Sequence, residues 1–459
     1  MRLLLIHFHC IGQIFLETLE EEGHQVILAS APDYYQKDKP GINELLTNRG
    51  SKLFNIDNYN YRHQSSSPRS YAHQLCNSKI LQLLLQSKRL SGLSNLSDSD
   101  RITLIRDHFA TCLNLLLSDS IEGVVFGGVP HSCVDHVMML AANHLALQCL
   151  VFMDQPFFPG SSFCYDSTLK LVPGYYMYSH IPGYTNHFRW LKKICIKVVQ
   201  NYEITGSFDM FKPDHDQGKQ GWSSLYSKRQ ETNLEYCSSS GKEYYEQWAG
   251  ASIPFPSTQI ASIMLHCEPE ATINPSIDEY FLNQLELATH MRSLIPVEIS
   301  LGIKEHPGMF SCYPDEDTAY IREHRSTYFQ QKLTTMPNTF LIDPTASMTD
   351  VINHSTIVIC SSGTAGIESL LSKKIVIGNR LSCLNGVPGF INALDYHHPS
   401  DSNSQSLLKT ITSNEIVSRM CLNCVPGSPA GQYNLLYKPN NLKNEFNMAT
   451  SIAAALKTT

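Results

Sequence analysis

The chain has 459 residues, too many for one ordinary hydrophobic core, so we expect two domains. Hydrophobic residues make up 42% of the sequence and charged residues 17%, proportions that are typical of a folded globular protein and leave little room for disorder. The formal net charge of −7 argues against a dedicated nucleic-acid-binding protein, because such proteins gain most of their affinity from basic surface that faces phosphates.

The 14 cysteines are scattered between Cys10 and Cys424 and lack the regular spacing of a disulfide framework. This usage indicates a reducing compartment. Cys421 and Cys424 form a single C-x-x-C, but no second pair stands at ligand spacing, so we do not expect zinc.

The first residues, "MRLLLIHFHC", could be mistaken for a secretion signal. His7 and His9 interrupt the apolar run, and "LEEEG" follows at once, so we interpret the segment as a first strand of a cytoplasmic protein. No uninterrupted apolar stretch approaches the ~20 residues that a membrane span needs.

Short apolar runs then alternate with helical patterns. "RLLLIHF", "GQIFLETLEEEG" and "HQVILAS" predict a strand, a helix and a second strand, which together form a βαβ unit. Further helical patterns follow at 72–90 and 100–117, and "GVVFGGVP" and "QCLVFMD" predict strands on either side of another helix. This alternation is typical of a parallel α/β sheet.

From about residue 182 to 250 the pattern weakens into polar, aromatic and Gly/Ser-rich sequence, which predicts an insertion and a connection between domains. Within it, "FRWLKKICIKVV" is basic and partly amphipathic. Such a helix could dock on an anionic surface at the inner face of a membrane, which would make the association peripheral. A solvated helix face that covers the domain is the interpretation we favour.

A second α/β series opens at "QIASIMLHCEP", and the strands "VEISLGIK", "TFLID", "TIVIC" and "KIVIG" follow. The same unit therefore recurs, and it predicts two Rossmann-like domains with parallel sheets that face a central cleft. We expect domains over 1–250 and 251–440, and a helix over 441–459 that packs back on the first domain.

His306 comes directly after the predicted strand "VEISLGIK", where a parallel sheet presents functional groups to a ligand. Pro307 restricts the residue before it to extended backbone and so limits where the imidazole can point. This pattern allows two roles for His306: its imidazole binds a ligand, or it forms a hydrogen bond with a nearby carbonyl.

The stretch "VICSSGTAGIESLLSKK" predicts a buried strand, a turn of small residues and a helix. The turn contains Ser361, Ser362, Gly363 and Thr364, which is more than one helix cap requires. Free N–H groups and the positive end of the helix dipole attract anions, so we expect a phosphate here. His306 and the two serines could surround that phosphate without a metal and stabilise the charge of a departing nucleotide.

Two glutamates, Glu268 and Glu270, follow another predicted strand in "LHCEPEATINP". Sugar transfer needs a carboxylate as base for the acceptor hydroxyl or as nucleophile. A plain surface charge is the alternative for one of them.

"HCEPEATINP", "GIKEHPGMF" and "SSGTAGIESLLSKKIVIGN", in this order, resemble the capsule polysaccharide biosynthesis family, which includes CMP-Kdo-dependent transferases of the bacterial surface. The resemblance is clearest over about residues 258–395 and weaker at 123–137. It implies the GT-B fold, with an acceptor-side domain first and the nucleotide sugar in the second domain.

By this resemblance, His306 and Pro307 are the His-Pro motif that meets the cytidylate phosphate, and Ser361 and Ser362 are its partner hydroxyl pair. Lys304 adds positive charge nearby. Glu368, in the helix that follows, is the candidate contact to the ribose, with a solvated helical glutamate as the alternative.

Glu270 stands where Kdo transferases show an acidic residue in an Asp-x-Ser setting, so it is the candidate nucleophile or base. Glutamate in place of aspartate leaves the stereochemical outcome and the sugar open. In the first domain, His131 and Asp154 follow predicted strands and are candidates for contacting the acceptor, with structural roles equally open.

Asp-x-Asp patterns occur at 98–100, 214–216 and 315–317. A metal-dependent transferase would hold such a pair at a strand end, whereas here the first caps a predicted helix and the others lie in predicted loops. We therefore expect neither a metal nor any other cofactor.

The sequence thus predicts a cytoplasmic, metal-independent GT-B glycosyltransferase that moves Kdo or a related acidic sugar from a CMP-activated donor to a glycan or glycolipid. A UDP-sugar transferase, a UDP-sugar 2-epimerase and a non-catalytic nucleotide-sugar-binding scaffold of an assembly or export complex are the alternatives. An epimerase would be expected to show His-Pro-Arg and a helix with paired glutamates, which His306-Pro307-Gly308 and the lone Glu368 fit poorly.

Overall fold

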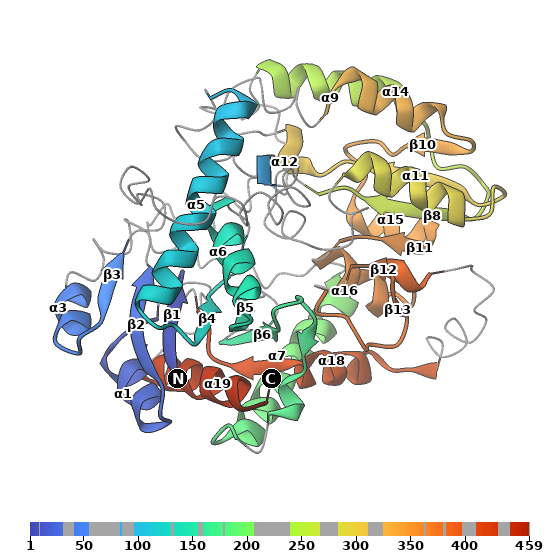
Figure 1. Ribbon diagram of the computed structural model, residues 1–459. Coiled ribbons are helices and arrows are strands. Elements are labelled where there is room, and N and C mark those ends of the chain that lie inside the picture. Colours follow the sequence, from blue (N-terminus) through green and yellow to red (C-terminus); the bar gives the residue numbers. More distant parts are fainter. Residues whose placement is uncertain are drawn as a thin grey trace. The chain divides into compact units, whose positions relative to one another are not determined.

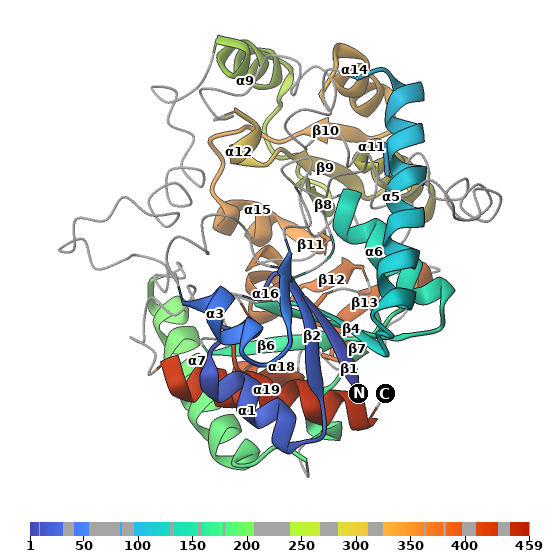
Figure 2. The ribbon, with the colours of Figure 1, turned by 60° about the vertical axis from the view of Figure 1, so that its left-hand side comes forward.

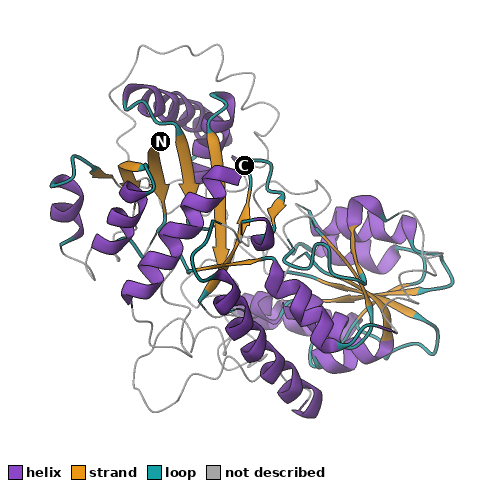
Figure 3. Cartoon of the chain, turned by 90° about the horizontal axis from the view of Figure 1, so that it is seen from below, coloured by secondary structure: helices purple, strands orange, loops and turns teal. Residues whose placement is uncertain are grey.

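The structure is a computed structural model (Figure 1). It describes residues 1–8, 10–30, 41–54, 83–84, 96–128, 130, 133–154, 158, 160–177, 180–205, 239–266, 283–310, 325–361, 364–379, 382–396, 410–429 and 441–458. The chain divides into two compact units, one made of Met1–Lys192 with Cys421–Thr459 and the other of Lys193–Met420. Each unit is built around its own sheet, with helices (purple) beside the strands (orange) in Figure 3.

The sheet of the first unit has the strand order β14-β6-β5-β4-β1-β2-β3, and β7 pairs with β6. The strands from β3 to β5 are mutually parallel, whereas β6 runs antiparallel to β5 and to β14. Their bounds are β1 Arg2–Ile6, β2 Gln25–Ser30, β3 Lys52–Phe54, β4 Gly123–Phe126, β5 Gln148–Asp154, β6 Ser161–Tyr165, β7 Leu171–Val172 and β14 Cys424–Pro426.

Both faces of this sheet are buried, and its strands are therefore mainly apolar. Leu3 and Leu5 of β1 belong to a core cluster that also contains buried residues of the helices α1, Gln13–Glu21, and α19, Asn441–Thr458. Successive side chains of a strand point to opposite faces, so Leu4 and Ile6, which are also fully buried, fill the other face. A continuous run of buried residues is typical of a parallel strand with helices on both sides.

One helix of the first unit comes from the C-terminal part of the chain, after the residues of the second unit. Asn441–Thr458 forms α19, which lies beside α1 (Figure 2), and Lys457 Nζ lies 2.5 Å from Glu22 Oε2. The other helices are α1 Gln13–Glu21, α3 Ile42–Thr47, α5 Asp98–Ser118, α6 Cys133–His144 and the 3-10 helix η1 Gly174–Tyr176.

The sheet of the second unit has the order β10-β9-β8-β11-β12-β13, and each neighbouring pair is parallel. Its strands are β8 Ile260–Met264, β9 Ser300–Lys304, β10 Thr339–Leu341, β11 Ser355–Ile359, β12 Ile375–Gly378 and β13 Phe390–Asn392. The helices are α9 Ser239–Ala251, α11 Gln284–Leu294, α12 Pro307–Phe310, α14 Thr327–Thr335, α15 Met348–His354, α16 Thr364–Leu371, η4 Ala393–Asp395 and α18 Ser413–Leu422.

Both sheets share the strand order of doubly wound, nucleotide-binding folds. In each unit the first strand lies in the middle, the second and third strands lie to one side, and the next strands lie to the other. The predicted class, α/β with the two Rossmann-like sheets of which GT-B proteins are made, is therefore confirmed.

The division between the units differs from the expected boundaries at 250 and 440. It falls between Lys192 and Lys193, inside the continuous helix α7, Tyr184–Thr205. The second half of this helix belongs to the second unit, where Tyr202 Oη lies 3.5 Å from Ser372 Oγ. None of the helices within the described ranges is long and apolar enough to cross a membrane.

Candidate functional site

The strand order of the second sheet reverses between β8 and β11. From β8 the chain adds β9 and β10 on one side, and β11, β12 and β13 on the other. In doubly wound sheets, ligands bind outside the carboxyl ends of the strands at such a reversal. The residues that follow β8, β9 and β11 are therefore the first candidates for a ligand site.

Three polar residues occupy equivalent positions there. His266, His306 and Ser361 each stand two residues beyond the last residue of their strand, since β8 ends at Met264, β9 at Lys304 and β11 at Ile359. Met264 pairs with Lys304, and Ile263 pairs with Ile359, so the three strands end at nearly the same level. The register therefore brings the three residues to one edge of one sheet, and His266 follows β8, the strand that lies between β9 and β11.

His266 and Ser361 are directly bonded. The backbone N–H of Ser361 donates to Nε2 of His266 at 3.1 Å. The hydroxyl oxygen of Ser361 accepts a short hydrogen bond from Nδ2 of Asn379, which is fully buried. The predicted turn after β11 is thus hydrogen-bonded to His266, which follows β8, and to Asn379, which follows β12.

Side chains from elsewhere in the unit also bind the backbone of His266. Gln284, at the start of α11, accepts from the His266 N–H at 2.6 Å and donates to its carbonyl at 3.0 Å. Nη2 of Arg325 donates to the same carbonyl at 2.9 Å. His266 is half-buried and its main chain is firmly held.

Arg325 also pairs with Glu305, the residue immediately before His306. Nε of Arg325 lies 2.6 Å from Oε2 of Glu305, and both side chains are completely buried. A buried ion pair needs further hydrogen bonds to offset the loss of water, and Glu305 accepts them from Tyr244 Oη at 2.5 Å and from the His306 N–H at 2.8 Å. This buried cluster therefore fixes the backbone on which His306 stands.

His306 itself is half-buried and precedes α12, where Pro307 occupies the first helical position that prolines favour. The His306 carbonyl accepts from the N–H of Met309 at 2.9 Å. Phe310 packs against the ring of Tyr244, with ring centroids 5.4 Å apart. The predicted His-Pro motif thus lies in a short, packed turn.

The ammonium group of Lys304 is hydrogen-bonded inside the protein and does not face the solvent. Its Nζ donates to the carbonyl of Pro344 at 2.9 Å, and the side chain is only 5% exposed. Burial lowers the pKa of Lys304 to about 8. The nearby charges of Glu305 and Asp343 raise this pKa, but their effect is smaller than that of burial. Its contribution to a phosphate site stays a prediction.

Thr364 and Glu368 belong to α16, which begins at Thr364. Burial raises the pKa of Glu368 to about 7. Burial and, to a smaller extent, the charge of Glu368 raise the pKa of Tyr202, which places this carboxyl near α7. The expected contact of Glu368 with a ribose stays a prediction.

Several predicted site residues lie outside the described ranges. These are His131, Glu268, Glu270, Ser362 and Gly363, and their roles stay predictions. Asp154 is the last residue of β5 and pairs in register with Ser162 of β6.

The first sheet reverses its strand order between β1 and β4, and a histidine stands there too. His7 follows β1 with a φ of 60°, and its Nε2 lies 2.8 Å from Oδ1 of Asp135, a residue of α6 that is 1% exposed. After β4, Gly127 passes so close that a Cβ atom would lie 2.5 Å from the His7 carbonyl oxygen. An imidazole held by a buried carboxylate is a usual arrangement in sites that transfer protons.

Sequence reasoning missed His7, His266, Gln284 and Arg325 as site residues. The signal for the two histidines was present, because each follows a buried apolar strand, as His306 does. Nothing local marks Gln284 or Arg325, whose partners are 18 and 59 residues away along the chain.

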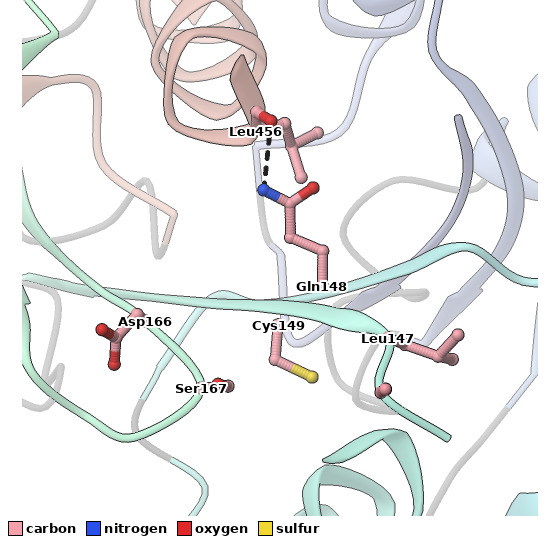
Figure 4. A pocket seen from close by; sticks show the side chains of 7 residues that line it. Leu147, Gln148, Cys149, Asp166, Ser167 and Leu456 are labelled. Atoms are coloured by element: carbon pink, nitrogen blue, oxygen red, sulfur yellow. Dashed lines mark hydrogen bonds between the residues drawn. The ribbon is translucent and has the colours of Figure 1, made fainter. Parts of the chain in front are cut away.

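A separate hollow lies at the opposite edge of the first sheet (Figure 4). Gln148, the first residue of β5, lines it and donates through Nε2 to the carbonyl of Leu456 at 3.0 Å. Because it lies at the amino end of a strand, it is not where a doubly wound sheet binds its ligand. Within the described ranges, no group of three or more His, Cys, Asp or Glu side chains is placed to hold a metal ion.

No protein-family model matches the sequence, and no curated protein matches it. Among solved structures, the chain is similar to UDP-GlcNAc 2-epimerase from Methanocaldococcus jannaschii, with 12% identity, complete coverage of both chains (100% each) and a TM-score of 0.23. It is similar to KpsC of Thermosulfurimonas dismutans, a β-Kdo 2,7 transferase, with 13% identity over 79% of this chain and 91% of that chain and a TM-score of 0.30.

MurG of Acinetobacter baumannii shares 11% identity over 97% of this chain and 98% of that chain, with a TM-score of 0.20. TM-scores this low carry no argument about function. The fold class follows from the strand orders described above, and membership of the capsule polysaccharide family stays a prediction.

Proposed function

We propose that this chain is a GT-B glycosyltransferase of bacterial surface polysaccharide biosynthesis. It transfers Kdo or a related acidic sugar from a CMP-activated donor to a glycan or glycolipid acceptor, and it uses neither a metal nor another cofactor. The observation that carries this proposal is the alignment of His266, His306 and Ser361 beyond the carboxyl ends of β8, β9 and β11, at the reversal of strand order.

In this proposal the second unit binds the nucleotide sugar. The His306 ring and the hydroxyl groups of Ser361 and Ser362 bind the phosphate, and they stabilise the charge that develops on it. The acceptor oxygen forms a bond to the anomeric carbon, the bond from that carbon to the phosphate oxygen breaks, and CMP leaves with the electron pair. Glu270 either takes the acceptor proton or first forms a glycosyl intermediate.

The first test compares nucleotides. Ligands that bind the native state raise its melting temperature, so we expect CMP to raise it more than equal concentrations of UDP or GDP. A larger shift with UDP would contradict the CMP assignment and favour a UDP-sugar enzyme.

The second test separates a transferase from a scaffold. Glu270→Gln should abolish sugar transfer from CMP-Kdo and leave CMP affinity unchanged, whereas His306→Ala should weaken CMP binding. Glu246→Gln, the same chemical change at an exposed position of α9, is the matched control and should alter neither. Transfer that survives in the Glu270→Gln variant would remove this residue from the mechanism, and wild-type protein that binds CMP without any transfer would indicate a scaffold.

A further inference from the structure

The buried carboxylate of Glu445 lies against the start of α1. Glu445 belongs to α19 and is only 7% exposed, and within the described ranges its Oε2 has no hydrogen-bond partner. A Cβ atom on Gly12, the residue before α1, would collide with both carboxylate oxygens, so the group directly faces the backbone of that turn. A buried carboxylate without hydrogen bonds is costly, so another feature of this place must offset its charge.

The amino end of α1 can offset that charge. The first backbone hydrogen bond of the helix runs from the Leu16 N–H to the Gly12 carbonyl, so the N–H groups of residues 13–15 have no partner inside the helix. The first turn of α1 contains no acidic residue, and Gly12 has no side chain that could cap it. The positive end of the helix dipole therefore attracts a negative charge from another segment, and Glu445 supplies one.

The same position is where a doubly wound sheet binds a phosphate. The helix α1 follows β1, and the strand order of the first sheet reverses between β1 and β4. In such sheets, phosphate groups of ligands lie at the amino end of the helix that follows this strand, and a glycine in the turn lets them approach the backbone closely. Here Gly12 provides that access, but the group that approaches it is the Glu445 carboxylate.

The packing of α19 fixes the carboxylate in this place. The helix lies beside α1 (Figure 2), and its residues Met448 and Ile452 belong to the same core cluster as Phe15 of α1. Beyond the other end of α1, Lys457 of α19 pairs with Glu22. The α19 helix therefore places an acid at the positive end of α1 and a base near its negative end.

We propose that the turn between β1 and α1 is an anion site of phosphate size that the protein fills with its own Glu445 carboxylate. While α19 is packed on the first unit, this site is closed to the phosphate groups of nucleotides and sugars. Removal of the Glu445 side chain opens it. The inference goes beyond the proposed function and does not rest on it, because it concerns the first unit alone.

Glu445→Ala removes the carboxylate and leaves space for a phosphate ion. We expect inorganic phosphate to bind at this turn about tenfold or more tightly in the variant than in wild type. Binding is followed through the backbone amide signals of Gly12 and Gln13 in NMR spectra of the isotope-labelled full chain, because these signals report on the first unit and not on the site near His306. Equal responses in the two proteins, or no response in the variant, would overturn the proposal and leave the proposed function untouched.

Glu445→Gln tests the charge in a variant that keeps the shape of the side chain, and it applies also if Glu445→Ala does not fold. If the carboxylate acts as the anion of α1, glutamine should lower the urea midpoint, because an amide dipole replaces a full charge at the amino end of the helix. Glu246→Gln, at an exposed position of α9, is the control and should keep the wild-type midpoint. If the contact were packing alone, Glu445→Gln would be as stable as wild type or more stable, since it no longer buries a charge, and the proposal would fail.

Discussion

Arg325 and Glu305 form an ion pair in the interior of the second unit, with Nε 2.6 Å from Oε2 and neither side chain exposed. The glutamate stands directly before His306, and the arginine also donates to the carbonyl of His266. The pair therefore joins the turns after β8 and β9 without contributing a side chain to the surface. Removing this ion pair should lower the free energy of unfolding and should also disturb the backbone of His266 and His306 at the candidate site.

Arg325→Met leaves the Glu305 carboxylate buried without its cation. We expect the free energy of unfolding to fall by about 3–5 kcal/mol, the usual penalty for breaking one side of a buried pair. Urea unfolding followed by circular dichroism measures it. The matched control is Arg419→Met, which breaks an exposed pair with Glu415 and should change stability by less than about 1 kcal/mol. Equal losses in the two variants would contradict the burial of the Arg325 charge.

Tyr244→Phe removes one hydroxyl that donates to Glu305 at 2.5 Å and leaves the aromatic packing on Phe310 in place. A hydrogen bond to a buried charge is worth about 1.5–3 kcal/mol, so we expect a loss of that size in urea unfolding. Tyr328→Phe, at a position 60% exposed, is the control and should have little effect. If the two variants were equally stable, the hydroxyl would not be bound to the carboxylate.

The fold could be predicted because its signals are local. Buried runs such as "IASIM" and "STIVI" form β8 and β11, and the alternation with helices indicated parallel sheets. His306 and Ser361 could be placed after strands for the same reason. The division between the units could not be found, because α7 continues through Lys192 and Lys193 with no break in its pattern.

The cluster around His266 depends on contacts that no local pattern contains. Arg325 meets Glu305 and His266 only because β8 and β9 pair in register, and the two contacts span 20 and 59 residues of sequence. In "LHCEPEATINP" the two glutamates drew the prediction toward acid–base chemistry, whereas the described structure places the histidine beside Ser361. The rule that found His306, a histidine after a buried strand, applies equally to His266 and His7.

Glu368 should make the protein less stable as the pH rises. Burial holds its pKa at about 7 in the folded chain, above the ordinary value of 4.5. The unfolded chain therefore loses this proton first, so the free energy of unfolding falls between about pH 4.5 and 7 and stays lower above that range. Glu368→Gln lacks this effect, and at pH 8 it should be more stable than wild type by roughly 1–3 kcal/mol.

Urea unfolding at pH 4, 6 and 8 tests the Glu368 prediction, with Glu246→Gln as an exposed control that should follow wild type at every pH. A Glu368→Gln variant that is less stable than wild type at pH 8 would indicate that the carboxylate has a stabilising partner. If the variant is more stable but binds CMP more weakly, the charged form is retained for the ligand, in line with the predicted contact to the ribose.

The close approach of Gly127 to His7 predicts an asymmetry between two adjacent glycines after β4. A Cβ atom on Gly127 would lie 2.5 Å from the His7 carbonyl oxygen, which is backbone and cannot rotate away, whereas one on Gly128 would meet nothing within 4 Å. We expect Gly127→Ala to lower the free energy of unfolding by about 1–3 kcal/mol, as overpacking does, and Gly128→Ala to leave it nearly unchanged. Because His7 is bonded to Asp135, the displaced backbone should also shift the His7 imidazole signals in the NMR spectrum. Equal stability of the two alanine variants would mean that the turns after β1 and β4 are farther apart than described.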